Sequence, residues 1–334
     1  MNTFVDVLRT DRLESRHRIH GVAVSADGAV LGDIGDSNFQ TYFRSSAKPF
    51  QALEVVRSGA FEKFGLTEKE LAVICSSHSG EDFHVQAVRN ILKKIGLTEN
   101  NLQCGFHPPI NEKAREVFFR EHREPSPVYN NCSGKHSGML AVCRLRNWPI
   151  ENYMSPEHPV QQEILGIISE YSGLPSSEIH LGVDGCGVPV FYLPLIKMAQ
   201  AYAKFFSETE RANQKIAEAM TKHPEMIGGT NRFDTDFMQA MDGSVVSKGG
   251  SEGLECSALL NGKLTVGFAV KVEDGNERAS WPALLEFYGQ LSLISEEKLE
   301  RLSAYRNPPI KNVAGKIVGE IRPNLLINQP VRTG

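Results

Sequence analysis

The stretch GLECSALLNGKLTVGFAVKV, from Gly253 to Val272, indicates the fold most clearly. It places the dipeptide Asn261-Gly262 between two apolar runs, and Asn-Gly between such runs is a strong signal for a two-residue hairpin turn. The stretch therefore predicts antiparallel strands at 253–260 and 263–272. Because side chains alternate along a strand, Ala269 and Lys271 are expected on one face.

Further strands are expected near both ends of the chain. Residues 18–24 and 29–32 flank a turn that contains Asp27-Gly28, and a last strand is expected near 316–321. Between the ends, apolar spacing and a capping box at 67–70 predict helices. Their expected ranges are 46–57, 82–95, 136–147, 160–171, 193–206, 208–221 and, nearer the C-terminus, 279–290.

These elements predict an α/β (α+β) fold. Strands from both chain ends are expected to form one antiparallel sheet, with a mostly helical middle segment and helices flanking the sheet. We expect a single domain over residues 1–334.

Composition narrows the class of protein. The 334 residues are 41% hydrophobic and 23% charged, with a formal net charge of −4, as in a soluble globular protein. The mild acidity and the lack of a basic block argue against a nucleic-acid partner, and no apolar run is long enough to predict a membrane span. The N-terminal residues lack the charged-then-apolar pattern of a secretory signal peptide. Six scattered cysteines without CxxC pairs predict reduced thiols and a cytoplasmic location.

A serine and a lysine stand three residues apart in the run RSSAKPF, from Arg44 to Phe50. On a helix this spacing brings Ser45 and Lys48 onto one face, where an unprotonated lysine can take the serine proton for nucleophilic attack. The helix dipole and burial both favour the neutral amine. About one Ser–Lys pair at this spacing is expected by chance in a chain of this length. The pair therefore indicates a catalytic site only together with the other motifs described below.

Four other segments are rich in small residues and reactive groups. Helix starts in such segments offer backbone N–H groups to a carboxylate or an oxyanion. Turns and caps have the same composition, and His78 and His136 could simply cap backbone. The four segments are 75–81, 130–138, 182–189 and the pair 248–253 with 267–275.

Other residues also have two interpretations. Arg232 could clamp a substrate carboxylate or pair structurally with Asp234. A lysine on a strand face, such as Lys271, is normally solvated. Cys75 and Cys143 have apolar neighbours and are predicted to be core thiols.

A metal site is a separate hypothesis. Cys132 and Cys186 both lie in tight polar loops, and Lys135 follows Cys132 by one helical turn. Zinc rarely takes lysine, because the amine must lose its proton to bind. His136 is the more conventional third ligand.

Taken in order, the motifs SSAKP, SSHSGE, NNCSGKHSGM, GVDGCGVPV, RFD and GFAVKVEDG resemble those of the asparaginase II family, the rhizobial-type or class 3 L-asparaginases. The resemblance runs from about Val5 to Ile321. It implies a fold like that of serine β-lactamases and glutaminases, a homodimer, and an asparagine-hydrolysing activity.

The resemblance also assigns roles to residues. It implies two Ser–Lys pairs, Ser45 with Lys48 and Ser77 with Lys271. It implies a zinc site that assists substrate binding and does not activate water. The implied zinc ligands are Cys132, Lys135 and Cys186, and the residues implied to line the substrate site are Arg44, His136 and Asp184.

The expected activity is hydrolysis of the side-chain amide of L-asparagine to L-aspartate and ammonia. Either serine could be the nucleophile. Ser45 is favoured, because its lysine lies one helical turn away, and Ser77 could instead relay a proton. The sequence has Lys248-Gly249-Gly250 where β-lactamases have Lys-Thr-Gly, and it has no Ser-Asp-Asn triplet, which argues against β-lactam substrates. The alternatives are a glutaminase, another β-lactamase-like Ser–Lys amidohydrolase or esterase, and a non-catalytic protein that binds an amino acid or a metal.

Overall fold

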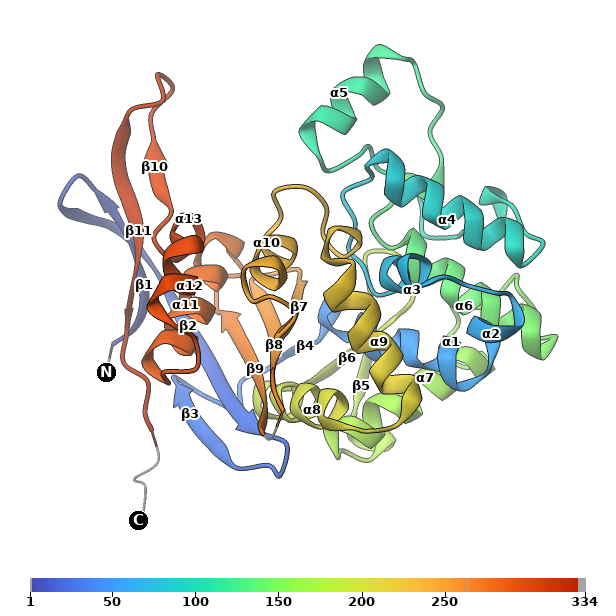
Figure 1. Cartoon of the computed structure of the whole chain (residues 1–334), viewed down its shortest axis with the longest axis horizontal. Helices are drawn as coiled ribbons and strands as arrows, with labels where there is room; N and C mark the ends of the chain where they lie inside the picture. The colour runs from blue at the N-terminus through green and yellow to red at the C-terminus, as the bar shows by residue number, and fades with distance from the viewer. Residues whose placement is uncertain (1, 263, 330–334) are drawn as a thin grey trace. The chain divides into compact units, whose positions relative to one another are not determined.

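A computed structural model describes residues 2–262 and 264–329, which form two compact units (Figure 1). The first unit contains Met1–Ser46, Leu193–Ser207 and Ala240–Gly334, and the second contains Ala47–Tyr192 and Glu208–Gln239. Each unit is thus assembled from segments that lie far apart in the sequence. The expectation of a single domain stays a prediction.

The first unit is built on an antiparallel sheet, to which the described residues contribute eight strands. The strand order is β10-β11-β1-β2-β9-β8-β7, and β3 pairs with β2. The predicted antiparallel sheet built from both chain ends is therefore confirmed. Its strands are β1 (Thr3–Arg9), β2 (Arg12–Ser25), β3 (Val30–Ile34), β7 (Val245–Gly250), β8 (Leu254–Asn261), β9 (Leu264–Val272), β10 (Pro309–Lys311) and β11 (Ile317–Leu325). The short strand β4 (Gln40–Tyr42) also belongs to this unit.

The predicted hairpin is confirmed as β8 and β9, with Leu254 opposite Lys271 and Asn261 opposite Leu264. Residue Lys263, where the second strand was expected to begin, lies outside the described residues. Strand β1 was not predicted, because three of its seven residues are polar or charged and it depends on long-range pairing with β11 and β2.

Helices cover both faces of this sheet. A Cβ on Gly267 of β9 would lie 2.0 Å from the carbonyl oxygen of Ala199, so helix α8 (Leu195–Ser207) packs closely on that face. The next residue, Phe268, points to the opposite face and stacks on Tyr288 of α11 (Ser280–Gln290), with ring centroids 4.1 Å apart. Because side chains alternate along β9, Lys271 lies on the α8 face. The other helices of this unit are α12 (Glu296–Arg301), α13 (Ser303–Arg306) and the 3-10 turns η1 (Arg44–Ala47) and η6 (Glu277–Ala279).

The second unit is mostly helical, as predicted (Figure 1). Its α-helices are α1 (Lys48–Arg57), α2 (Ala60–Lys63), α3 (Glu68–Ile74), α4 (Asp82–Lys94), α5 (Glu112–Arg120), α6 (Ser133–Arg146), α7 (Pro159–Ser172), α9 (Arg211–Lys222) and α10 (Phe233–Ala240). Its 3-10 turns are η2 (Glu99–Asn101), η3 (Pro127–Tyr129), η4 (Ser176–Glu178) and η5 (Pro224–Met226), and β5 (His180–Val183) pairs antiparallel with β6 (Pro189–Pro194).

Helices α3 and α6 approach each other closely because α6 carries glycines at the contact. A Cβ on Gly134 would lie 2.0 Å from the carbonyl oxygen of Val73, and one on Gly138 would lie 2.7 Å from Ile74. The predicted capping box at Thr67 and Glu70 starts α3. This contact brings the loop that follows α3 next to the first turn of α6, and both segments carry predicted site residues.

Among the described residues, no helix is both long and apolar enough to cross a lipid bilayer. All six cysteines are described, and all six are buried free thiols, as predicted from their spacing. Cys75 and Cys143 are fully buried in the apolar core.

Candidate active site

The side chain of Lys48 meets Ser77 in the second unit. Lys48 is the first residue of α1 and is fully buried. Its Nζ donates to Ser77 Oγ at 2.9 Å, to the carbonyl oxygen of Ser76 at 2.6 Å and to that of Asn131 at 3.4 Å. The lysine of the first predicted pair thus contacts the serine of the second.

The backbone around Ser77 is held from two directions. The Ser77 N–H donates to the carbonyl oxygen of Ile227 at 3.0 Å, and Ser79 Oγ donates to that of Gly228 at 2.5 Å. The segment 227–228 therefore fixes the loop after α3 on one side.

His78 holds the same loop from the side of α6. Its Nδ1 accepts from the Gly80 N–H at 3.2 Å, and its Nε2 lies 2.8 Å from Ser133 Oγ. Burial, with the neighbouring charges of His84 and Lys48, lowers the pKa of His78 well below its usual value, so the ring is neutral. With Nδ1 accepting, Nε2 carries the hydrogen and donates to Ser133, the first residue of α6. His78 therefore links the loop after α3 to the first turn of α6. This is a structural role and not a contact with a substrate.

The three residues implied as zinc ligands come together at the start of α6. Lys135 Nζ lies 3.1 Å from Cys186 Sγ and 3.8 Å from Asp184 Oδ2. The hydrogen bond from Cys132 lowers the pKa of Cys186 to about 5, although burial opposes this, and the same bond raises the pKa of Cys132 to about 12. Burial lowers the pKa of Lys135, but the Cys186 and Cys132 sulfurs and Asp184 outweigh it and leave that pKa raised. These shifts favour a protonated Lys135 beside a deprotonated Cys186, and zinc binding would need the Lys135 amine to lose its proton.

This donor set fits zinc through its two sulfurs and one amine. Among the described residues, no group of three or more His, Cys, Asp and Glu side chains is arranged to hold a metal ion. A zinc ion at this cluster therefore needs the Lys135 nitrogen as its third protein ligand, alongside the soft sulfur donors Cys132 and Cys186. His136, the more conventional ligand, is directed instead to Tyr153: its Nδ1 lies 2.6 Å from Tyr153 Oη.

Asp184 is positioned by a tight turn between β5 and β6. Its N–H donates to the carbonyl oxygen of Val188, and its own carbonyl oxygen accepts from Gly187, both at 2.9 Å. Gly187 adopts a φ of 92°, which other residues rarely reach. The glycines of GVDGCGVPV therefore make the turn that carries Asp184 and Cys186 to Lys135.

The remaining predicted residues belong to the first unit. Ser45 lies in the 3-10 turn η1, and Lys48 begins the α-helix that follows, so the two do not share one α-helix as the spacing predicted. Ser46 Oγ anchors this turn to β7 by donating to the carbonyl oxygen of Lys248 at 2.7 Å. Arg44 has a φ of 46°, a strained value of the kind found at functional sites.

Lys271 is nearly fully buried on the sheet, whereas a lysine on a strand is usually exposed to solvent. Its Nζ donates to the carbonyl oxygens of Glu252 at 2.6 Å and Val272 at 2.5 Å. Burial lowers the pKa of Lys271, against the opposing charges of Glu252, Asp274 and Glu273. Because Lys271 and Ser77 belong to different units, their pairing stays a prediction.

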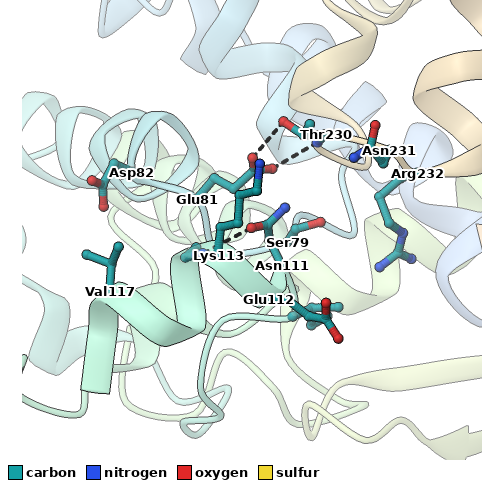
Figure 2. A pocket seen from close by; sticks show the side chains of 12 residues that line it. Ser79, Glu81, Asp82, Asn111, Glu112, Lys113, Val117, Thr230, Asn231 and Arg232 are labelled. Carbon is teal, nitrogen blue, oxygen red and sulfur yellow. Dashed lines mark hydrogen bonds between the residues drawn. The ribbon is translucent and has the colours of Figure 1, made fainter. Parts of the chain in front are cut away.

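A pocket of about 530 Å³ opens beside the loop of Ser77 (Figure 2). Glu81 is bonded there to Thr230, which donates its N–H to Oε2 at 2.9 Å and its Oγ1 to Oε1 at 2.7 Å. The Arg232 side chain extends away from this bonded pair in Figure 2. Arg232 lines the pocket, and its role, as a carboxylate clamp or as the structural partner of Asp234, stays a prediction.

Reasoning from sequence did not find Tyr153. The residue lies in the segment between α6 and α7, outside every motif, but it is fully buried and contacts His136. No spacing rule connects residues 136 and 153. The sequence itself shows only a tyrosine within a polar segment, and its burial depends on the fold.

Three comparisons relate this chain to known proteins. The model of the family described as L-asparaginase II matches residues 5–323. No curated protein matches the chain. The solved structures that the chain matches include a crystal structure of Mglu in its tris and glutamate form, at 13% identity and a TM-score of 0.37, which aligns over 86% of this chain. Another is Mglu in its native form, at 12% identity and a TM-score of 0.33 over 80% of this chain.

The chain spans 60% and 62% of the length of those two structures. The family match, in contrast, covers nearly all of the chain, from the first strand to the last. The chain therefore belongs to the L-asparaginase II family.

Proposed function

We propose that this protein is an L-asparaginase that hydrolyses the side-chain amide of L-asparagine through Ser–Lys catalysis. The observation that carries the proposal is the 2.9 Å contact between Lys48 Nζ and Ser77 Oγ. A lysine within hydrogen-bond reach of a serine is the arrangement that activates a hydroxyl nucleophile without histidine.

In the first half of the reaction, Ser77 Oγ attacks the amide carbon while its proton passes to Lys48. The tetrahedral intermediate then collapses, and ammonia leaves as it takes the proton from Lys48. In the second half, water gives a proton to Lys48 and attacks the ester, which releases L-aspartate and restores the serine hydroxyl. Ser45 is the second candidate nucleophile; in that case Ser77 relays the proton of Ser45 to Lys48. Lys271 is proposed to assist Ser77.

Zinc is proposed at Cys132, Lys135 and Cys186, where it would assist substrate binding. Arg44, His136 and Asp184 are proposed to line the substrate site. A homodimer and a cytoplasmic location also stay proposals from the family resemblance and from the free thiols.

The test is an assay of ammonia release from L-asparagine and L-glutamine, with a chromogenic β-lactam as a third substrate. We expect ammonia from L-asparagine, much less from L-glutamine, and no β-lactam hydrolysis. Ser77→Ala is the matched variant, and it should lose the activity toward L-asparagine. Equal release from the two amides would replace the proposal with a glutaminase-asparaginase of broad specificity. No release from either amide by zinc-loaded protein would contradict it.

A further inference from the structure

The hydrogen bonds around Tyr153 determine which ring nitrogen of His136 carries the hydrogen. Tyr153 Oη accepts the Gln103 N–H at 3.0 Å and lies 2.6 Å from His136 Nδ1. His136 and Tyr153 are both fully buried. Neither group can turn to solvent, so each must find its hydrogen-bond partner inside the protein.

Two arrangements of the hydrogen are conceivable, and they differ in how many groups they leave without a partner. If Nδ1 carried the hydrogen, the Tyr153 hydroxyl would have no acceptor among the described residues and His136 Nε2 would be a bare buried acceptor. If the hydroxyl donates to Nδ1, only the Nε2–H is left over. The second arrangement leaves fewer buried groups unsatisfied, so Nε2 is an N–H donor.

This Nε2 is a buried polar atom without a hydrogen-bond partner among the described residues. His136 directly follows Lys135 in the first turn of α6, and this turn packs on α3 next to the loop that carries Ser77. An unpaired buried donor in such a place is costly unless a ligand accepts from it.

We propose that Tyr153 is a positioning residue that holds His136 in the Nε2–H tautomer, so that this N–H binds a carboxylate oxygen of the substrate. The proposal rests on the proposed function, since L-asparagine supplies the carboxylate. To the proposed function it adds three points: the His136 atom that binds the substrate, the tautomer of the His136 ring, and Tyr153 as the residue that fixes this tautomer. A carboxylate is the acceptor of choice because a hydrogen bond to an ionised acceptor is about twice as strong as one to a neutral acceptor.

The tautomer can be measured without any variant. In protein with ¹⁵N-labelled histidine, a bare ring nitrogen and an N–H nitrogen have distinct ¹⁵N signals, and the His136 signals are those lost in His136→Ala. We expect Nδ1 bare and Nε2 protonated in the unliganded protein. A signal showing Nδ1 protonated would overturn the proposal. The outcome does not depend on turnover, so it can be separated from a failure of the proposed function.

Kinetics test the role of Tyr153. Tyr153→Phe keeps the ring and removes only the hydroxyl, so KM for L-asparagine should rise on the order of tenfold with kcat nearly unchanged, as for a lost bond to a charged group. Tyr171→Phe is the matched control, because it removes an equally buried hydroxyl that bonds to Arg57 and Asn213 instead. The control should leave KM unchanged.

A double-variant cycle separates positioning from simple loss of stability. If Tyr153 acts through His136, Tyr153→Phe should raise KM in the parent protein but add nothing in the His136→Ala background. Additive effects of the two changes on KM, or an unchanged KM in a folded Tyr153→Phe protein, would overturn the proposal.

Discussion

Lys48 Nζ lies 2.9 Å from Ser77 Oγ, so the first residue of one helix contacts the loop that follows another. The contact depends on the close packing of α3 against α6, which sets where that loop begins. The sequence spacing pairs Lys48 with Ser45 as well, and that pairing stays a prediction. In the structure, the lysine side chain runs toward the segment 76–77 and is fully buried there.

Replacing Lys48 with methionine keeps the buried bulk and removes the proton acceptor. We expect Lys48→Met to lower kcat by roughly 10²–10⁴-fold, the range for loss of a positioned general base. Lys69→Met, an exposed change on α3, is the control and should keep full activity. Steady-state ammonia release checks both. Turnover in a folded Lys48→Met protein within threefold of the parent would remove Lys48 from the mechanism.

Lys271, proposed to assist Ser77 as a second proton acceptor beside Lys48, should add a rise with pH to the activity. Burial lowers the pKa of this amine from its ordinary value of 10.5, and only the neutral amine can accept a proton. Activity should therefore rise with pH through the lowered pKa and level off above it, so the rise should be complete at a lower pH than an exposed lysine would give. Lys271→Met should remove this rise from the profile of kcat/KM against pH. An identical rise in the variant would assign the titration to another group.

The cysteine cluster predicts a metal content that depends on particular thiols. Zinc bound by Cys132, Lys135 and Cys186 should measure about one ion per chain and fall in Cys132→Ala and Cys186→Ala, because each removes a sulfur ligand. KM should rise in both variants while some turnover survives. Cys143→Ala removes a core thiol from α6, the helix that carries Lys135, and this variant should keep its zinc. Elemental analysis decides the matter: equal zinc in all four proteins, or none in any of them, would contradict the site.

Two helix glycines, Gly134 on α6 and Gly166 on α7, predict opposite stability effects from one kind of substitution. Gly134→Ala places a Cβ 2.0 Å from the carbonyl oxygen of Val73, so it should lower the free energy of unfolding by about 1–3 kcal/mol and also lower kcat. Gly166→Ala on α7 meets no atom within 4 Å and should raise that free energy by about 0.5–1 kcal/mol. Urea unfolding of both variants tests the pair. A neutral Gly134→Ala would mean that α3 and α6 do not pack this closely.

Local signals in the sequence predicted much of the fold. The Asn261-Gly262 turn, the capping box at Thr67 and the glycine after α4 each depend only on neighbouring residues, and each is found where it was expected. Strand β1 and helix α5 were missed. The strand is stabilised by partners distant in sequence, and the helix carries one fully buried side chain, so its apolar pattern is weak.

The sequence predicted which residues belong to the site, but it did not predict which of them contact one another. The motifs named Lys135 and Cys186, which the structure brings to 3.1 Å, but their convergence depends on how α6 meets the turn after β5. The partner of Lys48 and the role of Tyr153 both depend on contacts between segments that no spacing connects. Long-range packing decides these contacts, and one sequence carries no direct signal for it.

We propose that Lys48 activates Ser77 for attack on the amide of L-asparagine. Rapid acid quench during turnover, followed by peptide mapping by mass spectrometry, detects the ester that this attack forms. We expect an aspartyl ester on the peptide that contains Ser77, absent in Ser77→Ala and strongly reduced in Lys48→Met. An ester on Ser45 that forms normally in Ser77→Ala, or turnover without an ester on any serine, would contradict it.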